Sequence, residues 1–499
     1  MIDFKQYANE DGLPIIDNIT FDKLTEQYGR EEFRQQLADY LEEVRPPFPL
    51  KEISYERMRE IFLKLKNTDV WKYITNEKPP FPLAKFQKEK AINNFRKLQN
   101  ADFTDYITLE EKDRVIEKYD DYKYPYSEYA LGLIDCPSVF NDVSDYFHQD
   151  LRLACDSYGH RSPLNHFAYS SAKEMKAALG AIWRGVNDVK KVTVKDTDGN
   201  EIEKLVGGQL KQETYRMAFR LGAYIATQFK PVVAKAIYDM TDARTVLDTS
   251  CGWGDRLAGF YTSNAEEYYG CDPNPNTFQR YKKQCIEYEK ILTGNEPYMY
   301  FEDDKFISEG TKKVVIHRCG AEDLDYNSLP PIDCAFTSPP YFSTEEYNKG
   351  GENEEDQSWF KFNEYEKWRD DFFLPVSQKT FDALSPNGHM LLNIMNPKIK
   401  NKMYPSCDEV VDMLRDSFKG QVGMRIMQRP QSASSFLDKW TDVKGDGDEE
   451  QLSTKQGIDR TAMKDFMQKY YMENVWYFAK GDLDLFRHSR TGSLSSFFE

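Results

Sequence analysis

An apolar run that ends in a glycine-rich turn constrains this chain more than any other feature. Residues 245–248 read as a buried strand, and Gly252 and Gly254 follow shortly after it. Glycine lets the main chain approach a ligand closely. The residues after Gly254 can begin a helix, whose N-terminus favours an anionic group. A strand, a glycine turn and a helix in this order predict one unit of an open α/β sheet with a ligand at the turn.

Two further strands are predicted downstream, and acidic residues follow both. Residues 268–271 end at Asp272, at the spacing from Asp248 that suits an acidic side chain binding ribose hydroxyls. The sequence Asp-Pro-Asn-Pro that begins at Asp272 also favours a tight turn, and the two roles are compatible. Residues 314–319 precede Glu322 and Asp323, whose polar groups could flank an adenine ring.

A diproline lies between a hydroxyl and a phenol in Ser338, Pro339, Pro340 and Tyr341, directly after the apolar run 332–337. Proline fixes φ and restricts the residue before it, so the backbone carbonyls here would be held in place. Pro-Pro-Tyr by itself is also typical of a polyproline II surface segment. At the carboxyl end of a strand, with a glycine turn upstream, the tetrapeptide instead predicts a ligand site.

These residue types suit the exocyclic amine of a nucleobase, whose lone pair is delocalised into the ring. The Ser338 side chain and the Pro339 carbonyl could accept the two amine hydrogens, and Tyr341 offers a face on which an extruded base can stack. A serine hydroxyl without a partner is not a plausible general base at neutral pH. The site would therefore work by positioning and electrostatics, with the amine proton lost after the nitrogen has reacted.

Together these segments resemble the S-adenosylmethionine-dependent amino-methyltransferases of DNA. The family's Asp-x-x-Cys-Gly-x-Gly segment corresponds to residues 248–254, and its Ser-Pro-Pro-Tyr motif to residues 338–341. Residues 229–231 are similar to the segment that the family places before its glycine turn. The resemblance implies cofactor contacts by Phe229, Pro231, Asp248, Ser250, Cys251, Gly252, Gly254, Asp272, Glu322 and Asp323, catalytic roles for Ser338, Pro339, Pro340 and Tyr341, and no metal.

Two alternatives remain for the target base, and two for the nucleic acid that carries it. A serine at position 338 is typical of cytosine-N4 methylation in this family, whereas Asp or Asn there accompanies adenine-N6 methylation. The glycine turn precedes the tetrapeptide, which is the reverse of the order in many cytosine-N4 enzymes, so adenine stays open. RNA is a further alternative substrate, and a catalytically silent subunit that binds nucleic acid is an alternative of another class.

The predicted fold is α/β, a Rossmann-like methyltransferase domain with a mostly parallel twisted sheet and a helical N-terminal extension. Residues 1–160 are predicted as a mostly helical accessory domain, 161–228 as connecting helices and a hairpin, 229–485 as the methyltransferase domain and 486–499 as a tail. Helical spacing marks residues 21–44 and 54–66, and an Asp-Gly turn marks the hairpin within 192–206. The accessory domain could recognise DNA, dock a partner protein or brace the catalytic domain.

Composition limits where and how the chain can act. No apolar stretch approaches membrane-spanning length and the N-terminus lacks a signal-peptide core, so we expect a cytoplasmic protein of a bacterial or virus-infected bacterial cell. A net charge of −17 argues against nonspecific coating of nucleic acid. Duplex DNA would need a local basic surface, and residues 398–402, with three lysines, supply a candidate that could equally be a solvated face.

Overall fold

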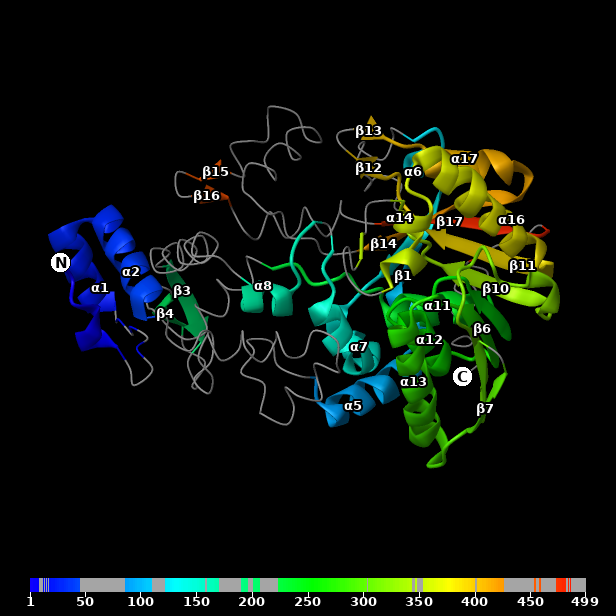
Figure 1. Ribbon diagram of the computed structural model, residues 1–499, viewed down its shortest axis with the longest axis horizontal. Coiled ribbons are helices and arrows are strands. Elements are labelled where there is room, and N and C mark those ends of the chain that lie inside the picture. Colours follow the sequence, from blue (N-terminus) through cyan, green and yellow to red (C-terminus); the bar gives the residue numbers. More distant parts are fainter. Residues whose placement is uncertain are drawn as a thin grey trace. The chain divides into compact units, whose positions relative to one another are not determined.

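The computed structural model describes most of the chain, and Figure 1 shows its elements. The described residues are 1–8, 18–44, 86–109, 122–157, 159–169, 190–195, 201–206, 223–302, 304–342, 353–399, 402–425 and 473–481, with a few single residues and pairs between them. The chain forms two compact units. One comprises Met1–Lys85, Gln149–Thr227 and Tyr347–Lys349, and the other, here the sheet unit, comprises Phe86–His148, Gln228–Glu346 and Gly350–Glu499.

Within the described residues, the sheet unit is built on one eleven-stranded sheet (Figure 1). In spatial order its strands are β1 (Ile107–Leu109), β2 (Ala130–Asp135), β14 (Phe418–Arg425), β17 (Glu473–Ala479), β11 (Leu384–Asn393), β10 (Ile332–Thr337), β5 (Thr245–Asp248), β6 (Glu267–Cys271), β9 (Lys313–His317), β8 (Lys305–Glu309) and β7 (Tyr298–Glu302). Only β1, β8 and β17 run against the direction of the others. The predicted Rossmann-like class with a mostly parallel sheet is confirmed.

The chain order reverses between β5 and β10. From β5 the chain continues to β6 and β9 on one side, whereas β10 and β11 lie on the other side. Strands β5 and β10 are parallel neighbours, with Val246 opposite Cys334 and Leu247 opposite Ala335. In open α/β sheets, ligands bind beyond the carboxyl ends of the strands at such a switch point. The predicted glycine turn follows β5, and the predicted tetrapeptide follows β10.

The central strands are apolar on both faces because helices cover both sides of the sheet. Val246 packs in a cluster with residues of α5 (Lys88–Gln99), α11 (Pro231–Met240), α12 (Asp255–Thr262) and α13 (Pro275–Thr293). Its neighbour Leu247 packs in a second cluster with η8 (Trp368–Phe373), α16 (Leu374–Asp382) and α17 (Ser406–Met413). Alternate residues of a strand point to opposite faces, so one apolar run contributes to both cores.

Two elements of the sheet unit depart from regular geometry. Strand β11 contains a bulge at residues 385–388, because Ile332 of β10 pairs with Leu384 whereas Cys334 pairs with His389. The π-helical η8, which begins at Trp368, continues as α16. Proline has no N–H, so Pro375 cannot donate the helical hydrogen bond to the preceding turn.

The segment Phe86–His148 differs from its predicted place in an accessory domain that ends near residue 160. Its strand β2 pairs in parallel with β14, with Ile134 opposite Met424, and β1 pairs with β2. Phe95 and Leu98 of α5 are fully buried in the core shared with the central strands. The segment therefore extends the sheet and its core, and these long-range pairings leave no local signal in the sequence.

The other unit contains one of the two predicted helical segments and the predicted hairpin. Helical spacing at residues 21–44 corresponds to α1 (Asn18–Tyr28) and α2 (Arg30–Val44), which are separated at Gly29, where φ is 77°. The predicted hairpin is confirmed as β3 (Lys190–Lys195) paired with β4 (Glu201–Val206). The predicted helix at 54–66 lies outside the described residues.

The remaining elements are short, apart from α7. They are η1 (Phe4–Tyr7), η2 (Phe103–Tyr106), α6 (Tyr126–Tyr129), η5 (Ser138–Phe140), α7 (Asp142–Ala154), α8 (Pro163–Tyr169), η6 (Tyr326–Ser328), η7 (Glu354–Asp356), α14 (Ser358–Lys361), α15 (Tyr365–Lys367), β12 (Lys398–Ile399), β13 (Lys402–Met403), η9 (Arg415–Ser417), β15 (Ser453–Thr454) and β16 (Gly457–Ile458).

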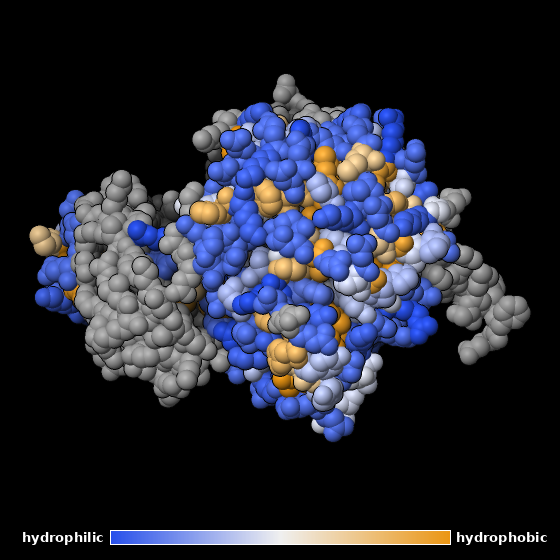
Figure 2. All heavy atoms as spheres, turned by 45° about the vertical axis from the view of Figure 1, so that its right-hand side comes forward, coloured by the Kyte–Doolittle hydropathy of each residue, from blue (hydrophilic) through white to orange (hydrophobic). Residues whose placement is uncertain are grey.

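Among the residues that the structure describes, no helix has the length and apolar character to cross a bilayer. Figure 2 shows a face covered mainly by hydrophilic residues, on which hydrophobic residues form small separate groups.

Acidification is expected to weaken the sheet through His389 of β11. Its buried ring lies with Nδ1 2.8 Å from the Tyr477 hydroxyl oxygen, and burial lowers the pKa of His389 from 6.5 to about 4. Between these values the unfolded chain binds a proton that the folded chain does not. This contribution to stability is present above pH 6.5 and is lost as the pH falls towards 4, by about 3 kcal/mol in all.

Urea denaturation across this pH window measures the effect, with His389→Gln as the comparison. The glutamine amide can still hydrogen-bond Tyr477 but does not titrate, so the variant should lose this part of the pH dependence. Equal pH dependence in the two proteins would contradict the assignment.

Candidate active site

The glycine turn after β5 requires glycine for two different reasons. Gly252 and Gly254 have φ of 56° and 68°, in the left-handed region that other residues rarely adopt. A Cβ on Gly252 would have only the Ser250 carbonyl oxygen near it, at 3.7 Å, so the conformation and not the space selects glycine there. A Cβ on Gly254 would instead collide with the Gln284 side chain. Gly254 also caps the N-terminus of α12.

The buried Asp248 carboxylate stabilises this turn. It is fully buried, and its Oδ2 accepts hydrogen bonds from Arg256 Nε at 2.9 Å and from the Tyr268 hydroxyl at 2.7 Å. Its Oδ1 accepts from the Ser250 N–H at 3.2 Å. The carboxylate therefore binds the chain's own groups, and a ligand in the turn would meet the main chain around Asp248 and not this enclosed side chain.

Asp272, at the end of β6, is brought to the same turn. Its Oδ2 accepts a hydrogen bond from the Gly252 N–H at 2.8 Å, which links the carboxyl ends of β6 and β5. Its Oδ1 accepts from the Asn274 N–H at 3.0 Å, forming the predicted Asp-x-Asn turn, and from the Thr277 hydroxyl at 3.1 Å. Burial raises the pKa of the Asp272 carboxyl, against the lowering effect of these bonds.

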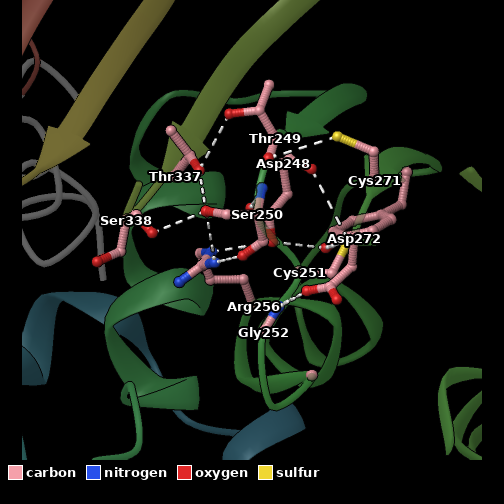
Figure 3. A network of polar contacts seen from close by, with 12 residues as sticks. Asp248, Thr249, Ser250, Cys251, Gly252, Arg256, Cys271, Asp272, Thr337 and Ser338 are labelled. Atoms are coloured by element: carbon pink, nitrogen blue, oxygen red, sulfur yellow. Dashed lines mark hydrogen bonds and ion pairs between the residues drawn. The ribbon is translucent and has the colours of Figure 1, made fainter. Parts of the chain in front are cut away.

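A chain of hydroxyl groups joins the glycine turn to the tetrapeptide, and Figure 3 shows it. The Thr249 hydroxyl donates to Thr337 Oγ1 at 3.2 Å, and Thr337 Oγ1 lies 2.7 Å from Ser250 Oγ. The Ser250 hydroxyl donates to the Ser338 carbonyl oxygen at 2.7 Å. Each hydroxyl has one hydrogen, so a single direction of donation, from Thr249 through Thr337 and Ser250 to Ser338, satisfies the whole chain.

The tetrapeptide is also fixed at its other end. The Tyr341 hydroxyl donates to the Asn393 carbonyl oxygen at 3.1 Å, where β11 ends. The next residue, Phe342, has φ of 44°, and its N–H donates to the Pro340 carbonyl oxygen at 3.0 Å in a tight reversal of the chain. Positive φ at a bulky residue is strained and persists only where the surroundings enforce it.

An aromatic cluster enforces the strained Phe342 conformation. The Phe342 ring is 6% exposed, and its centroid lies 5.7 Å from that of Tyr365, 6.0 Å from that of Trp368 and 5.8 Å from that of Tyr404. Edge-to-face and tilted aromatic pairs at these distances are attractive beyond the area that they bury. Burial of this ring thus holds the chain reversal that presents Tyr341.

The other predicted cofactor residues lie around the same edge of the sheet, in different environments. The Phe229 ring packs against Phe336 of β10 with centroids 5.4 Å apart, and the Arg256 guanidinium lies over it at 5.2 Å. Pro231 is the first residue of α11. Cys251 is buried, and burial together with the nearby Asp248 raises the pKa of its thiol well above the usual value, which marks a packing residue.

Glu322 and Asp323 follow β9 and share one lysine. Lys361 Nζ lies 2.9 Å from Glu322 Oε1 and 3.8 Å from Asp323 Oδ2. The Glu322 side chain is 16% exposed and that of Asp323 is 66% exposed. Of the two, Glu322 is thus the ordered acceptor beside the end of β9.

Sequence reasoning missed the residues that hold the motifs in place. Arg256 had a detectable signal, because an acidic residue at the end of a buried strand needs a nearby positive charge. No signal in the sequence pointed to the contacts of Asp255. Its Oδ1 accepts from Gln228 Nε2 at 2.9 Å and from the Ser144 hydroxyl, which is far away in the sequence.

Comparison with known families gives one match to the region that holds the tetrapeptide. Residues 332–480 match the family described as DNA methylase, whose model covers N6 and N4 methyltransferases. A comparison with curated proteins finds no match.

Solved structures share only a low overall similarity with the chain. Trm1 from Pyrococcus horikoshii in complex with S-adenosyl-L-methionine is 13% identical with a TM-score of 0.24, and the match covers 34% of this chain and 38% of that one. An rRNA methylase from Streptococcus thermophilus is 14% identical with a TM-score of 0.25, covering 41% and 93%. An S-adenosylmethionine-dependent O-methyltransferase from Thermotoga maritima is 11% identical with a TM-score of 0.27, covering 61% and 82%.

The family match begins at the first residue of β10 and ends just beyond β17. It thus includes the tetrapeptide, β11 and β17, which lie beside the glycine turn in one sheet. Over residues 332–480, the chain is therefore similar to the family of N6 and N4 DNA methylases.

Proposed function

We propose that this protein transfers a methyl group from S-adenosylmethionine to the exocyclic amine of a base extruded from DNA, with cytosine N4 as the favoured target. The observation that carries the proposal is the hydrogen bond from the Ser250 hydroxyl to the Ser338 carbonyl oxygen, at 2.7 Å. It ties the glycine turn to the tetrapeptide at the switch point of the sheet. A cofactor at the turn and an amine at the tetrapeptide would therefore be neighbours.

The residues at the turn fit the cofactor's ribose and backbone groups. Asp272 accepts hydrogen bonds from the Gly252 and Asn274 N–H groups and from the Thr277 hydroxyl, and we assign to the same carboxylate the contact with a ribose hydroxyl. The left-handed main chain at Gly252 has open space where a side chain would lie. We assign adenine contacts to Glu322 and Asp323, an apolar wall to Phe229, and the support of the turn to Asp248.

When bound, the cofactor would supply an electrophilic methyl group on a sulfonium. The chain's own residues would orient the nucleophile: the Ser338 hydroxyl and the Pro339 carbonyl would accept the amine hydrogens, and the Tyr341 ring would stack on the base. The amine nitrogen would attack the methyl carbon as the bond between that carbon and sulfur breaks. The proton would then leave the nitrogen for solvent. Ser338 would act through position and not as a base.

The second candidate is adenine-N6 methylation of DNA, because the matched family includes both kinds of amino-methyltransferase. The serine at position 338 favours cytosine. The geometry of Ser338, Pro339 and Tyr341 would serve either amine, so the product decides between the two.

Tyr341→Ala is expected to lower kcat/KM for DNA by about 10- to 100-fold, because stacking on an aromatic ring contributes about 1–3 kcal/mol per base. Cofactor affinity should change little, since the Tyr341 hydroxyl donates to the Asn393 carbonyl oxygen at the end of β11. Tyr341→Phe is the matched control: it keeps the ring, loses the hydrogen bond to Asn393, and should retain most of the activity. Equal losses in both variants would show that the hydroxyl, and not the ring, matters.

Cofactor binding and methyl transfer can be tested separately. Calorimetry with S-adenosylmethionine measures binding, and radiolabelled cofactor measures transfer to unmethylated duplex DNA or to an RNA transcript of the same sequence. The proposal expects binding and transfer to DNA. Binding with transfer only to RNA would reject the DNA substrate, and absence of binding would support a silent subunit.

A further inference from the structure

The hairpin β12–β13 projects from the chain directly after β11. Lys398 pairs with Met403 and Ile399 with Lys402, in antiparallel register. The Tyr404 N–H donates to the Pro397 carbonyl oxygen at 3.0 Å, which closes the base of the hairpin. Figure 1 shows β12 and β13 at the upper edge of the sheet unit, beyond the end of β11.

Polar contacts anchor the base of this hairpin. Asn396 Oδ1 accepts from the Cys407 N–H at 2.9 Å, in the first turn of α17. The Asn396 N–H donates to the Tyr122 hydroxyl at 3.2 Å. The base of the hairpin is therefore held by α17 and by Tyr122, both in the sheet unit.

The hairpin stands beside the tetrapeptide. The Tyr404 ring, which follows β13, packs against Phe342 at 5.8 Å and against Tyr365 at 4.3 Å. Tyr341 hydrogen-bonds Asn393, at the end of the strand that leads into the hairpin. A base stacked on Tyr341 would thus have the hairpin as a neighbour, and the phosphates on either side of that base would lie within the same region.

The hairpin carries basic side chains in an otherwise acidic protein. Lys398 and Lys402 are exposed, and no ion pair joins either lysine to an acidic residue in the part of the chain that the structure describes. Lys402 Nζ lies over the Tyr404 ring, 4.5 Å from its centroid. By contrast, Lys361 and Lys313 each pair with a glutamate. The whole chain has a net charge of −17, so unneutralised lysines beside the site are a specific feature.

The register places the two lysines on opposite faces of the hairpin. Directly opposite residues share a face of a two-stranded ribbon, so Lys398 lies on the face of Met403 and Lys402 on the face of Ile399. A two-stranded β-ribbon fits the major groove of B-DNA, with a phosphate backbone on each side. Met403, 52% exposed, adds an apolar side chain that can contact a base edge.

We infer that the β12–β13 hairpin binds duplex DNA beside the extruded base, with Lys398 and Lys402 contacting phosphates on the two sides of a groove. The inference rests on the proposed function, because it assumes that the base at Tyr341 comes from DNA. The hairpin would supply the local positive charge that an acidic protein needs in order to bind a polyanion.

The test is the double variant Lys398→Gln/Lys402→Gln, measured by fluorescence anisotropy with a labelled unmethylated duplex at several salt concentrations. Each lost phosphate contact lowers the salt slope of binding by about one, so the slope should fall by about two, and the Kd near physiological salt should rise at least about tenfold. Cofactor affinity and the melting temperature should not change.

The matched control is Arg96→Gln/Lys97→Gln on α5, which removes the same charge from exposed residues of the sheet unit. Figure 1 shows α5 at the opposite edge of the unit from the hairpin. A hairpin variant that binds DNA like the control would overturn the inference while leaving the proposed function intact. Wild-type protein that neither binds nor methylates DNA at low salt would instead reject the proposed function itself.

Discussion

Arg256→Met is expected to lower the free energy of unfolding of the sheet unit by about 3–5 kcal/mol, because it leaves the Asp248 carboxylate buried without its partner charge. The two side chains are 5% and 0% exposed, and Arg256 Nε lies 2.9 Å from Asp248 Oδ2. The same guanidinium donates to the Ser250 carbonyl oxygen. The variant should therefore also lose cofactor affinity, since the turn is no longer held.

Urea denaturation measures this loss, and two further variants serve as controls. Arg244→Met breaks the exposed ion pair with Glu266 and should leave the stability close to that of the wild type, because solvent screens exposed charges. Asp248→Asn combined with Arg256→Met removes both buried charges and should recover part of the stability. An Arg256→Met protein as stable as the wild type would show that Asp248 does not depend on Arg256.

Phe342→Ala is expected to destabilise the sheet unit by about 3–5 kcal/mol, as is usual when a buried phenylalanine is truncated. The ring is enclosed by Tyr365, Trp368 and Tyr404. Because the residue follows the tetrapeptide, methyl transfer should fall further than the fraction of unfolded protein explains.

Phe342→Gly tests the backbone strain separately. Glycine normally destabilises a protein more than alanine, but at φ of 44° it relieves a conformation that alanine cannot adopt freely. We therefore expect Phe342→Gly to be more stable than Phe342→Ala in urea denaturation. The usual order, with the glycine variant weaker, would show that positive φ at this position carries no strain.

The central strands could be predicted because burial on both faces leaves a continuous apolar run. Residues 332–337 form β10 with the predicted bounds, and residues 245–248 form β5. The glycine turn could be predicted equally well, because glycine adopts the left-handed φ found at Gly252 and Gly254 far more readily than other residues. These local constraints sufficed for the fold class.

Other parts depend on distant partners and could not be predicted. Strand β2 owes its place to β14, almost three hundred residues later in the chain, with Ile134 opposite Met424. The role of Asp248 depends on Arg256 and Tyr268, which enclose its carboxylate. A motif in the sequence identified the residue, but only the packing shows that its carboxylate supports the turn from within.

The most direct test of the account is nucleoside mass spectrometry of unmethylated DNA after incubation with the purified protein and S-adenosylmethionine, beside the Tyr341→Ala variant. The account predicts N4-methylcytosine with the intact protein and much less with the variant. N6-methyladenine would keep the reaction and change the base. Unmodified DNA, in the presence of a protein that calorimetry shows to bind the cofactor, would contradict the claim that this site methylates DNA.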